Sequence, residues 1–241
     1  MTVGIIGYGR FGKLSAKLIA RRANVLVYDK NLRPKQFPSR RIRNATLQKA
    51  SSQSIVILAV PVSSLQQALR SIVPYLQPSP LVLDVCAVKV KPVEWMKTIL
   101  PKDVSILGTH PLFGPDSAHA SIKGHRVFIC PVRIQRELLR HVIRQLKAAG
   151  LVVNTISPEE HDKMIAETLF LTQYIGRLVG KAGLRRHAFS TKSYTDLMKI
   201  IKIADNDTRE LFQDMLLYNP HAKQVLKRLL RAETNVLNEL Y

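Results

Sequence analysis

The stretch "VGIIGYGRFG", residues 3–12, decides how the first half of the chain folds. Its apolar start is of strand length, and Gly7, Gly9 and Gly12 then follow with the spacing G-x-G-x-x-G. Between a strand and a helix, this spacing is typical of a dinucleotide-binding loop. The first glycine permits a tight turn, the second lets the backbone approach a pyrophosphate, and the third lets helix and strand pack closely. The N-terminus of the helix that follows offers unpaired N–H groups to the phosphates.

A second strand-like run, "VLVYDK" at residues 25–30, contains Asp29 close to its end. A carboxylate there accepts hydrogen bonds from the adenosine ribose and repels a 2′-phosphate, which favours NAD. The nearby basic residues Arg10, Lys30 and Arg33 leave NADP possible. The run "LAVPVSS" at residues 58–64 reads as strand, turn and helix start, and is expected beneath the cofactor. The candidate cofactor-binding residues are Gly7, Tyr8, Gly9, Arg10, Phe11, Gly12, Asp29, Val60, Pro61, Ser63 and Asp84.

Short apolar runs alternate with amphipathic stretches through the first two thirds of the chain. The strand-like runs cover residues 3–6, 25–28, 55–60, 81–85, 105–109, 127–130 and 151–154. Helix-like periodicity covers residues 11–22, 63–76, 92–100 and 134–149. This alternation predicts a parallel sheet with crossover helices. We therefore expect an α/β fold, with a Rossmann-type doubly wound dinucleotide-binding domain over residues 1–155.

Residues 156–241 are predicted to form an all-helical domain. Ser157-Pro158-Glu159-Glu160 has the features of a helix start, with serine as N-cap and proline at the first helical position. A long, largely apolar helix is expected over 164–180, and further helix starts at 207–210 and 219–220. A helical domain of this length has little core of its own. We expect it to bind substrate and to pair with a second copy in a homodimer.

Composition bounds the possible partners. The formal net charge of +20 can indicate nucleic-acid binding, but the basic residues are spread along the chain without interleaved aromatics. We therefore expect a small-molecule substrate and no nucleic acid. We expect no membrane segment either, because no run approaches roughly 18 apolar residues and Thr2–Ile6 is too short for a signal peptide. Cys86 and Cys130 lie in apolar runs and are expected to be reduced, which predicts a cytoplasmic protein.

The stretch "GTHPLFGPDS", residues 108–117, places His110 where a strand-like run ends. Ligands of open α/β sheets bind at the carboxyl ends of the strands. A histidine there can accept a proton near neutral pH, so His110 is the candidate catalytic base. His119 and His125 lie close by in the sequence, but no cysteine or carboxylate spacing supports a metal site, and none is expected.

Several motifs, in this order along the chain, extend the interpretation. They are "DVCAVK" at 84–89, "THPLFGPDS" at 109–117, "EEHD" at 159–162, "TKSYTDL" at 191–197 and "LLYNPHA" at 216–222. Together they resemble the prephenate/arogenate dehydrogenase family of tyrosine biosynthesis, and its arogenate-using branch most. The resemblance implies oxidative decarboxylation of a cyclohexadienol, in which hydride goes to NAD(P), the ring carboxylate leaves as CO2, and His110 is the base.

The resemblance also implies substrate contacts, with three departures from the family pattern. Ala87 stands where the family usually has a serine, and Gln173 where it often has a histidine. Lys202, with Lys199 one turn earlier, fits best the cation that holds a substrate carboxylate, but lysine lacks the bidentate fork of arginine. Asp116 could meet the amino group of arogenate, although aspartate is also common in turns. The candidate substrate-binding residues are Asp116, Ser117, Gln173, Lys199 and Lys202.

Two other functions stay open at this point. One is a dehydrogenase of another small hydroxy acid, which would use a lysine of the second domain in place of His110. The other is a dinucleotide-binding regulatory protein without turnover. His161, in the first turn of a predicted helix, is expected to be structural.

Overall fold

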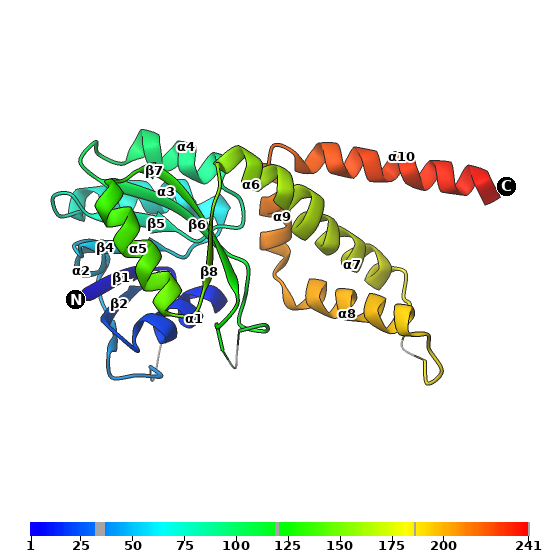
Figure 1. Ribbon diagram of the computed structural model, residues 1–241, viewed down its shortest axis with the longest axis horizontal. Helices are drawn as coiled ribbons and strands as arrows, with labels where there is room; N and C mark the ends of the chain where they lie inside the picture. Colours follow the sequence, from blue (N-terminus) through cyan, green and yellow to red (C-terminus); the bar gives the residue numbers. More distant parts are fainter. Residues whose placement is uncertain (32–36, 119–120, 186, 241) are drawn as a thin grey trace. The chain divides into compact units, whose positions relative to one another are not determined.

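The computed structural model describes residues 1–31, 37–118, 121–185 and 187–240. Contacts divide the chain into two compact units, Met1–Pro158 and Glu159–Tyr241. Figure 1 shows the first unit as a sheet flanked by helices and the second as helices alone.

The first unit is built on a single sheet. Its described strands are β1 (Thr2–Ile6), β2 (Asn24–Tyr28), β3 (Ile42–Asn44), β4 (Ile55–Leu58), β5 (Leu81–Asp84), β6 (Ser105–Pro111), β7 (Arg126–Arg133) and β8 (Val152–Thr155). They form an eight-stranded sheet in the order β3-β2-β1-β4-β5-β6-β7-β8. The predicted Rossmann-type α/β fold is therefore confirmed.

One pairing differs from the expected parallel sheet, because β7 runs antiparallel to β6. The connection over residues 112–125 contains no helix in its described part. A parallel return would need a crossover connection, usually a helix, so the chain turns back beside β6 instead.

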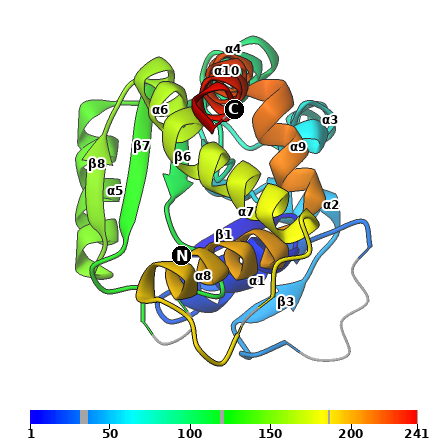
Figure 2. The same cartoon turned by 90° about the vertical axis from the view of Figure 1, so that its right-hand side faces the viewer.

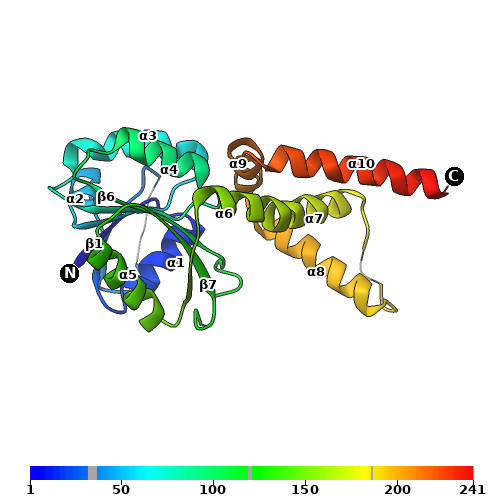
Figure 3. The ribbon, with the colours of Figure 1, turned by 45° about the horizontal axis from the view of Figure 1, so that its top comes forward.

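Helices cover both faces of the sheet (Figure 3). They are α1 (Arg10–Ile19), α2 (Leu47–Ser51), α3 (Val62–Ile72, continued by the 3₁₀ turn η1, Val73–Tyr75), α4 (Val90–Ile99) and α5 (Arg136–Ala148). Helices α1 and α5 lie on one face, and α3 and α4 on the other. The short elements β3 and α2 were not predicted, because three and five residues are too few to show a period.

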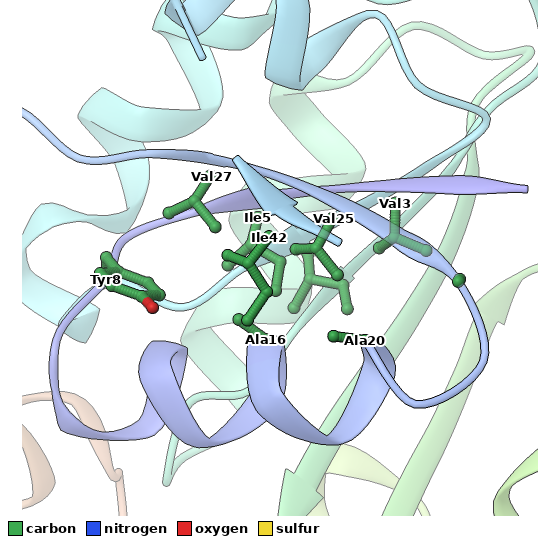
Figure 4. Packing of buried hydrophobic residues seen from close by; sticks show 10 residues of the cluster. Val3, Ile5, Tyr8, Ala16, Ala20, Val25, Val27 and Ile42 are labelled. Carbon is green, nitrogen blue, oxygen red and sulfur yellow. The ribbon is translucent and has the colours of Figure 1, made fainter. Parts of the chain in front are cut away.

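The packing of α1 on β1 and β2 holds the glycine loop in place (Figure 4). Ile5, Val25 and Val27 are fully buried beneath the helix. The helix side is lined by Ala16, also fully buried, and Ala20. Small side chains on the helix and branched ones on the strands let α1 pack closely on β1 and β2. This close packing constrains the short loop that joins β1 to α1.

The strand register brings several strand ends to one level. Ile6 pairs with Leu58, Leu58 with Asp84, and Asp84 with Gly108. Strand β6 continues beyond this level to Pro111. Because β1 and β4 connect to opposite halves of the sheet, this carboxyl edge includes the topological switch point at which such folds bind ligands.

The second unit is helical, as predicted. Its described helices are α6 (Pro158–Ile165), the π-helical turn η2 (Ala166–Phe170), α7 (Leu171–Lys181), α8 (Lys192–Asn206), α9 (Arg209–Tyr218) and α10 (Ala222–Leu240). The expected continuous helix over 164–180 is thus interrupted by η2. No described helix is long and apolar enough to cross a membrane.

Two predicted helix starts are displaced. Helix α9 is capped by Thr208, whose hydroxyl accepts a hydrogen bond from the Leu211 amide at 3.1 Å. The predicted cap was one residue earlier, at Asp207, whose side chain is used elsewhere. Helix α10 begins at Ala222, because Asn219 first makes a turn by accepting a hydrogen bond from the His221 amide.

Helices α7 and α8 lie side by side (Figures 1 and 2). Gly176 permits this approach, because a Cβ there would lie 2.6 Å from the Cβ of Ala204 and 2.9 Å from the carbonyl oxygen of Ile200. Phe170 and Phe212 stack with ring centroids 5.7 Å apart and fill the space between η2 and α9.

Candidate active site

The glycine loop between β1 and α1 has the geometry of a phosphate cradle. Gly7 has φ +101°, and a Cβ there would lie 2.4 Å from the carbonyl oxygen of Ala59. A Cβ on Gly12 would lie 2.3 Å from the carbonyl oxygen of Gly7, whereas a Cβ on Gly9 would meet nothing within 4 Å. Gly7 and Gly12 are therefore required by the protein itself, while Gly9 faces open space. Gly9 is also the N-cap of α1 and offers no capping side chain, so the loop fits a bound pyrophosphate.

Asp29 anchors this loop to the end of β2. Its Oδ2 accepts a hydrogen bond from the Tyr8 amide at 2.7 Å, and its Oδ1 accepts one from the Asn31 amide at 2.8 Å. Carboxylate oxygens can accept further hydrogen bonds, so this anchoring is compatible with the predicted ribose contact. Lys30 beside it is exposed, and Arg33 lies outside the described residues.

Tyr8 is buried and belongs to the hydrophobic cluster beneath α1 (Figure 4). Its ring packs edge-on against Phe37 with centroids 5.5 Å apart, and Lys13 Nζ lies 5.9 Å from the ring centroid. Burial raises the pKa of the Tyr8 hydroxyl. Contact of Tyr8 with the cofactor stays a prediction.

The loop between β4 and α3 lies against the glycine loop. A Cβ on Gly7 would lie 3.0 Å from Cγ1 of Val60. Pro61 is the N-cap of α3, and Ser63 is exposed in the first turn of that helix. On the other side, Phe11 packs against Phe113 with ring centroids 6.2 Å apart.

An ion pair joins the glycine loop to the loop after β6. Arg10 Nη2 lies 2.6 Å from Asp116 Oδ2, and both side chains are about half exposed. The structure thus brings together a predicted cofactor residue and a predicted substrate residue. Ser117 accepts a hydrogen bond from the Gly114 amide at 3.0 Å and closes the turn between them. Contacts of Asp116 and Ser117 with substrate remain predictions.

His110 lies within β6 rather than after it, and pairs with Phe128 of β7. Its exposed fraction is 6%. By the alternation of a strand, its side chain shares a face with Gly108. His125 packs against Phe113 at 5.2 Å, and His119 lies outside the described residues. The ring of His110 is thus held on the carboxyl edge of the sheet by a strand that continues beyond its neighbour β5.

Asp84, a predicted cofactor-binding residue, lies in a buried network of polar contacts. The side chain is fully buried and forms an ion pair with the equally buried Lys89. Its carboxylate also accepts hydrogen bonds from the Cys86 amide at 2.9 Å and the Thr109 amide at 3.3 Å. This network was not predicted from the sequence. A lysine inside the apolar run "CAVKV", shortly after an aspartate that ends a strand, could have indicated a buried ion pair.

Gln173 on α7 is fully buried within the second unit. Its Nε2 donates to Asp207 Oδ2 at 2.6 Å, and Arg177, one turn later, donates to the Asp207 carbonyl oxygen at 2.9 Å. Within the described residues, Gln173 Oε1 has no hydrogen-bond partner. Gln173 thus ties α7 to the turn between α8 and α9, and its contact with substrate stays a prediction.

The predicted substrate cations lie on α8. Lys199 Nζ lies 2.8 Å from Asp196 Oδ1. Hydrogen bonds from Lys192 and then Lys199 lower the pKa of the Asp196 carboxyl. Lys202, one turn after Lys199, is exposed. Binding of a substrate carboxylate by Lys199 and Lys202 stays a prediction.

Two of the sequence motifs meet in the second unit. In "EEHD", His161 Nδ1 lies 2.8 Å from Asp162 Oδ1, and both side chains are fully buried. From "LLYNPHA", Asn219 Nδ2 donates to the Asp162 carbonyl oxygen at 2.8 Å, and His221 Nε2 lies 2.9 Å from Glu159 Oε1. These contacts fix the start of α6 to the α9–α10 turn and support the structural role expected of His161.

The fold and the glycine loop define a nucleotide-binding domain of the NAD(P)-dependent dehydrogenase class. Comparison with known proteins places the chain within that class. Residues 34–156 match the family model of the prephenate dehydrogenase nucleotide-binding domain, and residues 178–241 match the TYRAAT1-like C-terminal domain. The chain therefore belongs to the prephenate/arogenate dehydrogenase family, which confirms the resemblance seen in the sequence motifs.

Individual relatives support the same family assignment. Arogenate dehydrogenase 2, chloroplastic, of Arabidopsis thaliana is 30% identical over 252 residues, which cover 100% of this chain and 70% of the relative. Arogenate dehydrogenase 1, chloroplastic, of the same plant is 27% identical over 252 residues, and there the chain spans 39% of the relative. The crystal structure of prephenate dehydrogenase from A. aeolicus, in complex with hydroxyphenyl propionate and NAD+, has a TM-score of 0.75 at 22% identity and covers 100% of this chain and 89% of that one.

Proposed function

We propose that this chain catalyses the NAD(P)-dependent oxidative decarboxylation of arogenate or prephenate in tyrosine biosynthesis. The observation that carries the proposal is the place of His110. It is a buried histidine at the carboxyl edge of the sheet, two residues beyond the level that Ile6, Leu58, Asp84 and Gly108 share. The glycine loop begins at that same edge, so a base and a dinucleotide would meet there.

In this proposal, an imidazole nitrogen of His110 accepts the proton of the substrate hydroxyl. NAD(P), when bound, supplies a hydride acceptor. Loss of this proton makes it easier for hydride to leave the ring carbon that bears the oxygen. The bond from the ring to the carboxylate then breaks and releases CO2. The electron pair of that bond makes the ring aromatic, and the proton held by His110 can return to the phenolic oxygen.

The glycine loop binds the pyrophosphate through the N–H groups at the start of α1, and Asp29 receives the adenosine ribose. A carboxylate near the ribose favours NAD over NADP by charge repulsion. Lys199 and Lys202 are proposed to bind a substrate carboxylate, while Asp116, Ser117 and Gln173 complete the substrate contacts. In this assignment, residues 1–155 form the dinucleotide-binding domain and residues 156–241 the substrate and dimerisation domain.

We further propose a homodimer formed through the helical domain. Helix α10 supports it, because residues 230–240 are all exposed and include Leu230, Val236, Leu237 and Leu240. Exposed apolar side chains gathered on one element are typical of an interaction surface. A cytoplasmic location is proposed from Cys86 and Cys130, which are both buried and are expected to be reduced.

A turnover assay tests the proposed function. The purified protein is incubated with NAD or NADP and with arogenate, prephenate or a saturated hydroxy acid, and reduced nicotinamide is followed by absorbance. We expect turnover on at least one of the two cyclohexadienyl acids, with CO2 released in equal amount. Cofactor binding without turnover would instead indicate a regulatory protein, and turnover of the hydroxy acid alone another dehydrogenase.

A further inference from the structure

Strand β6 extends past its neighbour β5 at the point where His110 lies. Asp84, the last residue of β5, pairs with Gly108, and the backbone pairing between β5 and β6 ends there. On the other side, β7 continues to pair with β6 through His110 and Pro111. Beyond Gly108, contacts to β6 from the β5 side therefore come from outside the backbone ladder.

Asp84 provides that support with its own side chain and backbone. Its Oδ1 accepts a hydrogen bond from the Thr109 amide at 3.3 Å, and its carbonyl oxygen accepts one from the Thr109 hydroxyl. Both bonds attach to the residue that directly precedes His110. The carboxylate thus continues the hydrogen bonding between β5 and β6 for one residue beyond the backbone ladder.

Lys89 holds the carboxylate in this position. It is the N-cap of α4, it is fully buried, and its Nζ pairs with Asp84 Oδ2. Its stem passes over Gly108, because a Cβ on Gly108 would lie 3.4 Å from Lys89 Cδ and 3.1 Å from Val93 Cγ2. A carboxylate buried without a partner would be unfavourable, so Lys89 stabilises the buried Asp84 side chain beneath the edge of the site.

We propose that Asp84, Lys89 and Thr109, here called the Asp84 clamp, position His110 for proton transfer. The inference rests on the proposed function in taking His110 as the base. The clamp residues are positioning residues: Asp84 and Lys89 are fully buried and act through β6. This assignment replaces the cofactor contact that the sequence suggested for Asp84.

The test compares two clamp variants with a matched control. Thr109→Val keeps the shape of the side chain and removes its hydroxyl. Asp84→Asn combined with Lys89→Met removes both buried charges together, so neither is left unpaired. The control is Lys91→Met, which removes the exposed ion pair with Glu94 on the same helix α4. Folding is checked by circular dichroism and cofactor affinity by titration with reduced nicotinamide.

Two readouts are followed, kcat and the rate at which diethyl pyrocarbonate modifies His110, measured by mass spectrometry of its peptide. We expect both clamp variants to lose about tenfold or more in kcat, since small misplacements of a catalytic group have large effects, with cofactor Kd unchanged. His110 should be modified several times faster, because its strand end is loosened. Thr109→Ser, which restores the hydroxyl, and Lys91→Met should behave like the parent.

Two results would overturn the clamp. One is Thr109→Val with the parent's kcat and the parent's rate of His110 modification. The other is a folded Asp84→Asn, Lys89→Met protein that loses cofactor affinity while kcat stays unchanged, since Asp84 would then act on the cofactor. If the double variant does not fold, Thr109→Val alone decides. Absence of turnover by the parent would contradict the proposed function only, and the modification rate would then decide whether the clamp holds His110.

Discussion

At the scale of single residues, Asp29 has two roles that can be separated. Its carboxylate accepts the Tyr8 and Asn31 amides, and its charge would repel a 2′-phosphate. Serine can still accept an amide hydrogen bond but carries no charge. The structural role can therefore be partly retained while the electrostatic one is removed.

We expect Asp29→Ser to shift the ratio of NADP to NAD affinity toward NADP by about tenfold, equivalent to about 1.4 kcal/mol. The measurement is cofactor Kd by titration. Asp103 is the matched control, because its Oδ2 also accepts a backbone amide, that of Ser79, at 2.9 Å. Asp103→Ser should leave the ratio unchanged. A parent protein that already binds NADP much more tightly than NAD would show that the basic residues outweigh Asp29.

Ala87 lies buried between Asp84 and Lys89, at the position where the family usually has a serine. Under the proposed function, Ala87→Ser restores one neutral hydrogen bond to the substrate hydroxyl or to His110. Such a bond is worth about 0.5–1.5 kcal/mol, so kcat/KM on arogenate or prephenate should rise by up to about tenfold. No gain on either acid, with folding intact, would mean that Ala87 belongs to a site shaped for a differently substituted ring.

At the scale of elements, the β1–α1 unit was predictable and its neighbours only in part. Gly7, Gly9 and Gly12 combine three backbone requirements in a few residues, so the sequence specifies strand, turn and helix together. The reversal of β7 could not be predicted, because strand-forming residues such as Val127 and Ile129 look the same in either direction. The Asp84–Lys89 pair was missed because its energetics depend on burial, and burial depends on how β5, β6 and α4 pack together. Gln173 was placed by analogy with a family histidine, while its contact with Asp207 depends on how α7 meets the α8–α9 turn.

The glycine loop itself offers a matched pair of substitutions. A Cβ on Gly12 collides with the backbone of Gly7, whereas a Cβ on Gly9 meets only open space. Gly9 has φ −67° and ψ −164°, which alanine adopts readily. We therefore expect Gly12→Ala to lower the free energy of unfolding by about 1–3 kcal/mol. Gly9→Ala should leave that free energy nearly unchanged and instead weaken cofactor binding by about tenfold or more, equivalent to about 1.4 kcal/mol.

Urea unfolding and cofactor titration measure the two effects separately. If the fold requires Gly12 and the cofactor requires Gly9, stability changes at Gly12 and cofactor affinity changes at Gly9. A Gly9→Ala protein that binds cofactor as tightly as the parent would show that the pyrophosphate does not approach this part of the backbone.

At the scale of the whole molecule, the net charge affects the attraction of ligands, and the exposed apolar surface affects association between copies of the chain. The formal net charge of +20 favours attraction of anionic small molecules, which include both cofactor and substrate. The apolar residues at the end of α10 have a different consequence, because Val236 and Leu237 are 55% and 49% exposed. A dimer that buries them would remove this surface from water.

We expect the protein to sediment as a dimer at micromolar concentration. Val236→Glu combined with Leu237→Glu should shift it toward monomer, because charges replace the apolar contact. Lys223→Glu, at an exposed position near the start of the same helix, is the control for a change of charge alone. A parent protein that sediments as a monomer would contradict the proposed dimer directly.

The central claim of this account is that His110 accepts the proton of the substrate hydroxyl. Its most direct test is the kcat of His110→Asn on arogenate or prephenate, with cofactor Kd measured on the same protein and His141→Asn, an exposed histidine on α5, as control. We predict that kcat falls by about two to four orders of magnitude, that cofactor Kd is unchanged, and that the control retains the parent's kcat. A folded His110→Asn protein with kcat close to the parent's would contradict the claim.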